Sequence, residues 1–153
     1  MQDLHSTTDE CSTIGMIVKG SLYFNVAVSK SKIHGKGLYS VESIPARRKI
    51  GSLAGQMISK NEARRKAKLK SSISIVELWN GKALDASVSS NALRYINHSC
   101  QPSTYMRTFG NHVEFYALRS IKPKEELTCN YGPTHHDGKR RCNCGADNCK
   151  GFI

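Results

Sequence analysis

The sequence predicts a mainly β domain with short helices. Its 153 residues are enough to bury one hydrophobic core. Short runs of β-branched and aromatic residues are typical of strands, and the 12 glycines suit the turns between them. The pair Asn80-Gly81 is the strongest hairpin signal in the chain. We therefore expect one compact domain of many short strands.

The first half of the chain contains three expected strands and a helix. Strands are expected at 21–28, 35–41 and 49–58, where valine, isoleucine, leucine and aromatic residues cluster. Ser59 then stands three residues before Glu62, which is a capping-box pattern, so a helix is expected over 60–70.

The second half adds further strands. The Asn-Gly turn predicts a hairpin of 74–78 with 82–86, and two later strands are expected at 113–118 and 127–130. Residues 94–96 are expected to end a short helix or to form a buried turn, because Pro102 prevents regular structure from continuing.

The predicted helix is strongly basic and has only a thin apolar stripe. Ala63, Ala67 and Leu69 form the stripe. The cations around it are Lys60, Arg64, Arg65, Lys66, Lys68 and Lys70. One side of this helix is therefore expected in solvent or against an anionic partner, and a solvated face is the simpler interpretation.

Charge and the N-terminal residues bear on the environment of the protein. Lys and Arg number 23 against 12 Asp and Glu, a formal net charge of +11, and residues 1–15 hold three of the acids and no Lys or Arg. We expect 1–15 to be a flexible tail. Because 1–15 does not resemble a secretory signal and the chain has no transmembrane run, we expect an intracellular protein with reduced cysteines.

Three closely spaced cysteines indicate a metal site. Cys142, Cys144 and Cys149 lie within eight residues, and Gly145 and Gly151 let the backbone fold around a centre. A closed structural zinc site needs a fourth ligand, for which Cys100 is the strongest candidate. The other candidates are Cys11, Cys129, His135 and His136. Disulfides among the six cysteines are the alternative.

The bend at 97–100 places an amide, an imidazole and a thiol side by side. Its residues are Asn97, His98, Ser99 and Cys100. They are either parts of a functional site or, more simply, turn residues beside a core histidine and a small hydrophobic cysteine.

In their order along the chain, five motifs resemble the SET-domain protein lysine methyltransferases. Residues 35–39 are similar to the first cofactor motif, and 53–56 stand where that family has Tyr-x-Gly-Glu. The sequence at 94–102 resembles Arg-Phe-x-Asn-His-Ser-Cys-x-Pro, and 126–132 resembles Glu-Leu-Thr-x-Asp-Tyr-Gly. The cysteines at 142–149 match the post-SET Cys-x-Cys-x4-Cys pattern.

The resemblance implies a fold, a reaction and a division of the chain. It implies small curved sheets around a pseudoknot, in which the segment of Tyr131 passes the bend of Asn97. The SET domain would occupy 16–133, and 134–153 would be a post-SET zinc-binding segment. The implied reaction is methyl transfer from S-adenosylmethionine to a lysine ε-amine of a protein, with a histone as the first expected substrate. This would place the protein at chromatin in a eukaryote and in the cytoplasm of a bacterium.

Roles for single residues follow from the same resemblance. Tyr131 would be the catalytic hydroxyl. The cofactor would be bound by Lys36, Gly37, Leu38, Asn97 and His98, with Phe152 as a lid over the adenine. Arg94 would be a structural neighbour of the bend. For Gly35 and Gly37, a role in turns alone is the alternative to close approach of the cofactor.

Several positions differ from the family pattern. Leu53 and Gln56 replace a tyrosine and a glutamate, so the shape of the lysine channel is expected to differ. Asn130 replaces an aspartate, and Ser103 replaces an asparagine. Cys129 stands where the family has the Phe or Tyr that governs how many methyl groups fit, so we expect a roomy pocket that allows di- or trimethylation.

The partner is the least determined part of the prediction. A basic domain does not obviously attract a lysine-rich tail. Nucleic acid could contact the basic helix and residues 139–141, with the substrate peptide in an acidic or neutral groove. A non-histone substrate, a catalytically silent SET-like zinc module and a basic zinc-binding nucleic-acid module are the alternatives.

Overall fold

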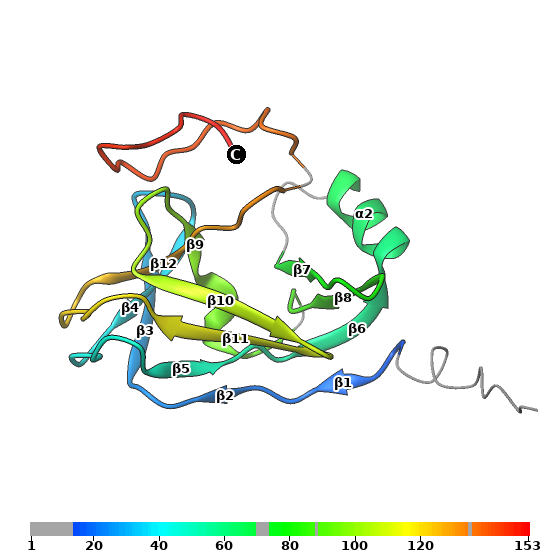
Figure 1. Cartoon of the computed structure of the whole chain (residues 1–153), viewed down its shortest axis with the longest axis horizontal. Coiled ribbons are helices and arrows are strands. Elements are labelled where there is room, and N and C mark those ends of the chain that lie inside the picture. The colour runs from blue at the N-terminus through cyan, green and yellow to red at the C-terminus, as the bar shows by residue number, and fades with distance from the viewer. Residues whose placement is uncertain (1–13, 70–73, 88, 135) are drawn as a thin grey trace, which may run out of the picture.

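The computed structural model describes residues 14–69, 74–87, 89–134 and 136–153. They form two curved sheets, with helix α2 (Lys60–Leu69) at one end and the C-terminal segment crossing above the larger sheet (Figure 1). Most of the predicted tail at 1–15, and Lys70 at the predicted helix end, lie outside the described residues. The mainly β prediction is confirmed. In the described part, no helix is long and apolar enough to span a membrane.

The larger sheet contains the predicted site segments. Its strands run in the order β2 (Ser21–Leu22), β5 (Lys49–Ser52), β11 (His112–Ala117), β10 (Thr104–Phe109), β12 (Glu126–Cys129), β4 (Lys36–Ser40) and β3 (Val26–Lys30), and β9 (Asn97–His98) pairs with β12. A 3-10 turn, η1 (Ala92–Tyr95), leads into β9, as the buried-turn prediction requires. The unpredicted β10 pairs with β11 over its whole length.

The smaller sheet contains the predicted hairpin. Its strands run in the order β1 (Ile17–Val18), β6 (Gly55–Ser59), β8 (Lys82–Asp85) and β7 (Ile75–Glu77). Gly81 has a φ of +77°, the left-handed conformation that such a turn needs, and the amide of Lys82 donates to Asn80 Oδ1 at 3.2 Å. The Asn-Gly hairpin is thus confirmed.

Two predicted strands are each divided. The run 21–28 becomes β2 and β3, because the chain bends at Phe24 between pairing with β5 and pairing with β4. The run 49–58 becomes β5 and β6, because the chain leaves one sheet for the other: Leu53 donates its amide to Val113, whereas Met57 donates to Met16. Single continuous strands were therefore the wrong prediction for both runs.

The hydrophobic core lies between the two sheets and η1. Seventeen buried residues form its main cluster. The largest fully buried side chains include Leu38, Ile50, Met57, Leu84, Leu93 and Leu127. Because β4, β12 and η1 all contribute to this cluster, the segments on either side of the bend at Asn97 are fixed by core packing.

Helix α2 packs on the smaller sheet through fewer residues than its sequence predicted. Ser59 Oγ accepts the amide of Glu62 at 3.1 Å, which confirms the cap. Ala63 is buried, but Leu69 is 79% exposed and does not belong to the packed stripe. Lys66 also differs from the solvated prediction, because its Nζ binds Asp85 Oδ2 at 2.8 Å.

The ion pair with Lys66 helps to keep the buried carboxylate of Asp85 ionised. Its side chain is only 4% exposed. Burial alone would raise its pKa, but hydrogen bonds from Lys66 and Ser87 outweigh burial and hold the pKa below its ordinary value. Because the pKa of Asp85 is lower in the folded protein, its ionised carboxylate stabilises the fold at pH values above its unfolded pKa of about 4. This stabilisation is lost as the pH falls through the folded pKa.

Replacing Lys66 by Met is therefore expected to lower the free energy of unfolding at pH 7 by about 1–2 kcal/mol, because Asp85 keeps its burial but loses its cation. Urea denaturation measures this loss, which should shrink below about pH 4 as Asp85 becomes protonated. Lys68→Met on the same helix is the control, since no ion pair of Lys68 is seen in the described part of the chain. An equal loss in both variants would contradict the role of the pair.

Candidate active site

The site begins with the pairing of β9 and β12. These strands are parallel, with Asn97 opposite Thr128 and His98 opposite Cys129. Ser103 reinforces the pairing, because it exchanges buried hydrogen bonds with the backbone and hydroxyl of Thr128. The pairing brings the Asn-His bend beside the residues that follow β12, as the resemblance implied.

Tyr131 lies directly over the bend. Its hydroxyl donates to the carbonyl of Ile96 at 2.5 Å, and its amide donates to His98 Nδ1 at 3.1 Å. The Tyr131 and His98 rings meet edge to face, with centroids 5.3 Å apart. Although 42% of Tyr131 is exposed, the burial of its hydroxyl end raises its pKa, so the phenol is neutral at physiological pH.

His98 connects Tyr131 to the cysteines. Its Nδ1 accepts a hydrogen bond, so a neutral ring carries its hydrogen on Nε2, which lies 3.6 Å from Cys100 Sγ. Burial lowers the pKa of His98 and favours this neutral form. The ring therefore orients both the backbone of Tyr131 and the sulfur of Cys100.

The structure brings the four predicted cysteines together. The sulfur atoms of Cys100, Cys142, Cys144 and Cys149 all lie within 4.8 Å of one another. The Cys100 and Cys142 sulfurs are 3.9 Å apart, and the amide of Lys150 donates to Cys100 Sγ at 3.5 Å. The described cysteines are free thiols.

The alternative fourth ligands do not join this cluster. Cys129 is buried in β12, and His136 lies beside Arg140, with 3.2 Å between His136 Nε2 and Arg140 Nη1. Cys11 and His135 lie outside the described residues.

Glu126 is a positioning residue to which sequence analysis gave no role. Asn97 Nδ2 donates to Glu126 Oε1 at 3.1 Å and also to the carbonyls of His34 and Lys36 at 3.2 and 3.0 Å. Ser31 Oγ donates to the same carboxylate at 2.8 Å. The position of Glu126 inside the Glu-Leu-Thr motif was the one available signal.

Glycine at 37 follows from this network. A Cβ on Gly37 would lie 2.3 Å from Glu126 Oε1, so any larger residue would displace the carboxylate. Gly35, with a φ of +47° and open space around it, instead makes the turn before β4. The two glycines therefore have different functions: one permits close packing and the other permits a turn.

A cavity of about 940 Å³ lies over these residues. Lys36, Asn97, His98 and Tyr131 line it. The predicted cofactor residues Gly37 and Leu38 lie behind its wall in β4, where Leu38 is fully buried. Phe152 is exposed outside the lining, while its neighbour Ile153 lines the cavity.

One wall of the same cavity is apolar. Its lining side chains are Leu53, Val76, Leu93, Ile96, Met106, Phe115 and Cys129. Cys129 is 1% exposed, and burial raises the pKa of its thiol to about 11, so it is an uncharged wall residue. An amine placed beside this wall would be disfavoured in its charged form.

Arg94 holds the loop before the bend. Its Nη1 donates to the carbonyls of Ser87 and Ser89 at 2.7 and 2.8 Å, and its guanidinium lies 4.7 Å from the centre of the Tyr95 ring. Its structural role is thus visible, although it also lines the cavity.

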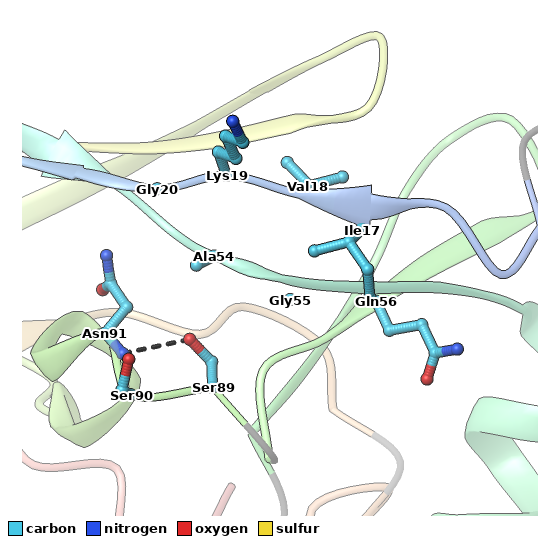
Figure 2. A pocket seen from close by; sticks show the side chains of 10 residues that line it. All are labelled: Ile17, Val18, Lys19, Gly20, Ala54, Gly55, Gln56, Ser89, Ser90 and Asn91. Atoms are coloured by element: carbon cyan, nitrogen blue, oxygen red, sulfur yellow. Dashed lines mark hydrogen bonds between the residues drawn. The ribbon is translucent and has the colours of Figure 1, made fainter.

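A second hollow of about 580 Å³ lies between β1, the start of β6 and residues 89–91. Figure 2 shows Gln56 beside Ile17, and to their left the hydrogen bond between Asn91 and Ser89. Gln56 lines this hollow, whereas Leu53 lines the larger cavity. The two altered residues of the second motif therefore act in different places.

Comparison with known proteins agrees with this geometry. The SET domain model matches residues 35–132. Histone-lysine N-methyltransferase trithorax of Drosophila virilis is 32% identical over 136 residues, which cover 84% of this chain and 4% of the relative. The H3 lysine-4 specific histone-lysine N-methyltransferase of Saccharomyces cerevisiae is 35% identical over 140 residues, 84% of this chain and 13% of the relative. This chain spans a small part of both relatives' length, and it belongs to the SET domain family.

Proposed function

We propose that this chain transfers the methyl group of S-adenosylmethionine to the ε-amine of a protein lysine. The observation that carries the proposal is the position of Tyr131, whose hydroxyl stands at the bend of Asn97 and His98 in one cavity with an apolar wall. The relatives' names add support, since both are histone-lysine N-methyltransferases.

For methyl transfer, the ε-amine of the substrate lysine must be uncharged when it is bound. A free lysine has a pKa near 10.4 and is mostly protonated at neutral pH. The apolar wall around Phe115 and Cys129 lowers that pKa by desolvation. The Tyr131 hydroxyl and the Ile96 carbonyl, which are already joined by a hydrogen bond, then orient the amine.

S-adenosylmethionine would supply a methyl group already activated on its sulfonium. We assign its binding to the cavity side formed by Lys36, Asn97 and His98, with Gly37 and Leu38 supporting this side from β4. Because the Asn97 side chain is used to hold the backbone of His34 and Lys36, it would act by fixing the shape of this side. Phe152 would cover the adenine from the tail.

Cys100, Cys142, Cys144 and Cys149 would hold one zinc ion. Zn–S bonds of about 2.3 Å in a tetrahedron place sulfur atoms about 3.8 Å apart. The separation of 3.9 Å between Cys100 and Cys142 suits this geometry, as does the hydrogen bond from the Gly151 amide to Cys149 Sγ at 3.4 Å. The ion would join the tail, 134–153, to the SET domain, 16–133.

A histone is the first substrate class to test, because the relatives' names point to it. This proposal carries the location with it, at chromatin in a eukaryotic host or in the cytoplasm of a bacterial one. Nucleic acid contact through α2 and residues 139–141 is a further part of the proposal, supported by the net charge of +11.

Replacing Tyr131 by Phe tests the catalytic role. Calorimetry should show S-adenosylmethionine binding to wild type and variant alike, while tritium transfer to a lysine peptide library falls at least about a hundredfold, because the orienting hydroxyl is gone. Tyr105→Phe is the control, since it removes a hydroxyl outside the cavity. Full transfer by Tyr131→Phe would refute the assignment.

Metal removal tests the zinc site. Wild-type protein should contain one zinc, and Cys100→Ser should lose it, whereas Cys129→Ser removes a thiol outside the cluster and should retain it. Chelation should also weaken cofactor binding about tenfold or more, because His98 connects Cys100 to the cavity. Unchanged cofactor affinity in metal-free protein would separate the two sites.

Substitutions of Cys129 test how many methyl groups are transferred to one lysine. Mass spectrometry under excess cofactor should show di- or trimethyl product with wild type, because a small side chain lines the cavity here. Cys129→Tyr should shift the product toward one methyl by filling that space, while Cys129→Ser should not. A wild-type product that stops at one methyl contradicts the expectation.

A further inference from the structure

The active-site cavity is lined by an excess of positive charge. Among the described residues that line it are two carboxylates, Glu77 and Asp137. The lining cations are Lys36, Arg64, Lys68, Arg94, Arg140 and Arg141. The lining of this cavity is therefore basic. It differs from the acidic or neutral groove that was expected for the substrate peptide.

Four of these cations form what we call the cationic rim: Arg64, Lys68, Arg140 and Arg141. The first two stand on α2, and the other two stand on the C-terminal segment. Figure 1 shows α2 beside β7 and the C-terminal segment above β9. Arg64, Lys68 and Arg141 are exposed, so a peptide entering the cavity would meet them.

Little of this charge is neutralised within the chain. Glu77 is shared between Arg64 at 3.5 Å and Lys60 at 3.4 Å. In the described part of the chain, the ion pairs include none from Lys68, Arg140 or Arg141 to a carboxylate. Bound S-adenosylmethionine would not remove the excess, because its ammonium and sulfonium outweigh its single carboxylate.

Such a rim repels peptides rich in lysine and arginine and attracts acidic ones. We propose that the substrate segment carries aspartate or glutamate beside the target lysine. This inference rests on the proposed methyl transfer and narrows its substrate class. A histone satisfies it only at a lysine with acidic neighbours, and a non-histone protein with such a segment fits equally well.

The rim cations and the acidic peptide residues would meet in solvent, so we expect a moderate effect on peptide affinity. Exposed ion pairs typically change affinity a few-fold each, and two or three acting together give about tenfold. Exposed charges are also screened by salt over a Debye length of about 10 Å at 0.1 M. The preference should therefore be largest at low ionic strength.

The test uses three peptides of equal length with one lysine, flanked by Glu, by Gln or by Arg. At low salt, kcat/KM for methyl transfer should fall in that order, with about tenfold between the Glu and Arg peptides, and the difference should shrink as salt is added. Equal rates, or preference for the Arg peptide, would overturn the inference.

Two charge reversals on α2 show whether the rim itself is responsible. Lys68→Glu changes a residue of the rim, and Arg65→Glu makes the same charge change at an exposed residue outside the lining. Lys68→Glu should reduce the Glu-over-Arg preference about threefold, whereas Arg65→Glu should leave it. Equal effects of the two variants would assign the preference to the net charge of the protein and contradict a local rim.

Peptide binding separates failure of this inference from failure of the proposed function. Fluorescence anisotropy with S-adenosylhomocysteine present measures the affinity of the same three peptides without methyl transfer. The Glu peptide should bind most tightly even if no lysine is methylated, in which case the proposed function fails and the inference stands as a binding preference. Methylation of all three peptides with equal affinity would leave the function intact and refute the inference.

Discussion

The parallel pairing of β9 with β12 is the constraint on which the site depends. It joins residues 31 positions apart, Asn97 to Thr128 and His98 to Cys129. Closing a loop of that length costs only a few kcal/mol of chain entropy, which buried bonds such as those of Ser103 help to offset. Once the pairing forms, Tyr131 can reach the Ile96 carbonyl, and His98 lies between that tyrosine and Cys100.

The cavity joins two environments that both disfavour positive charge but act on different groups, the target amine and the peptide that carries it. Near Tyr131, a wall that includes Phe115 and Cys129 disfavours a charged amine, so it favours the nucleophilic form of lysine. At the mouth, the cationic rim of Arg64, Lys68, Arg140 and Arg141 would select among the peptides that deliver the lysine in the proposed reaction. The reaction and the choice of substrate are thus assigned to separate residues, which can be altered independently.

Local sequence signals predicted those features that need only neighbouring residues. The Asn80-Gly81 turn and the Ser59 cap follow from local backbone chemistry, and the clustering of Cys142, Cys144 and Cys149 was expected from their close spacing. Cys100 was the strongest candidate for a fourth ligand among the remaining cysteines and histidines, and the resemblance to SET-domain enzymes implied the approach of Tyr131 to the bend. Neither contact is local.

Features that depend on distant partners were not predictable from patterns. The division of 49–58 arises from where Leu53 and Met57 find acceptors in different sheets, and the carboxylate of Glu126 acquires its role from Asn97 and Ser31. The most direct test is a crystal structure with S-adenosylhomocysteine and a lysine peptide. The sulfur atom of S-adenosylhomocysteine and the ε-amine of the lysine should lie close together in the cavity, beside the Tyr131 hydroxyl. Either molecule bound in the second hollow near Gln56, or both atoms far from that hydroxyl, would contradict the account.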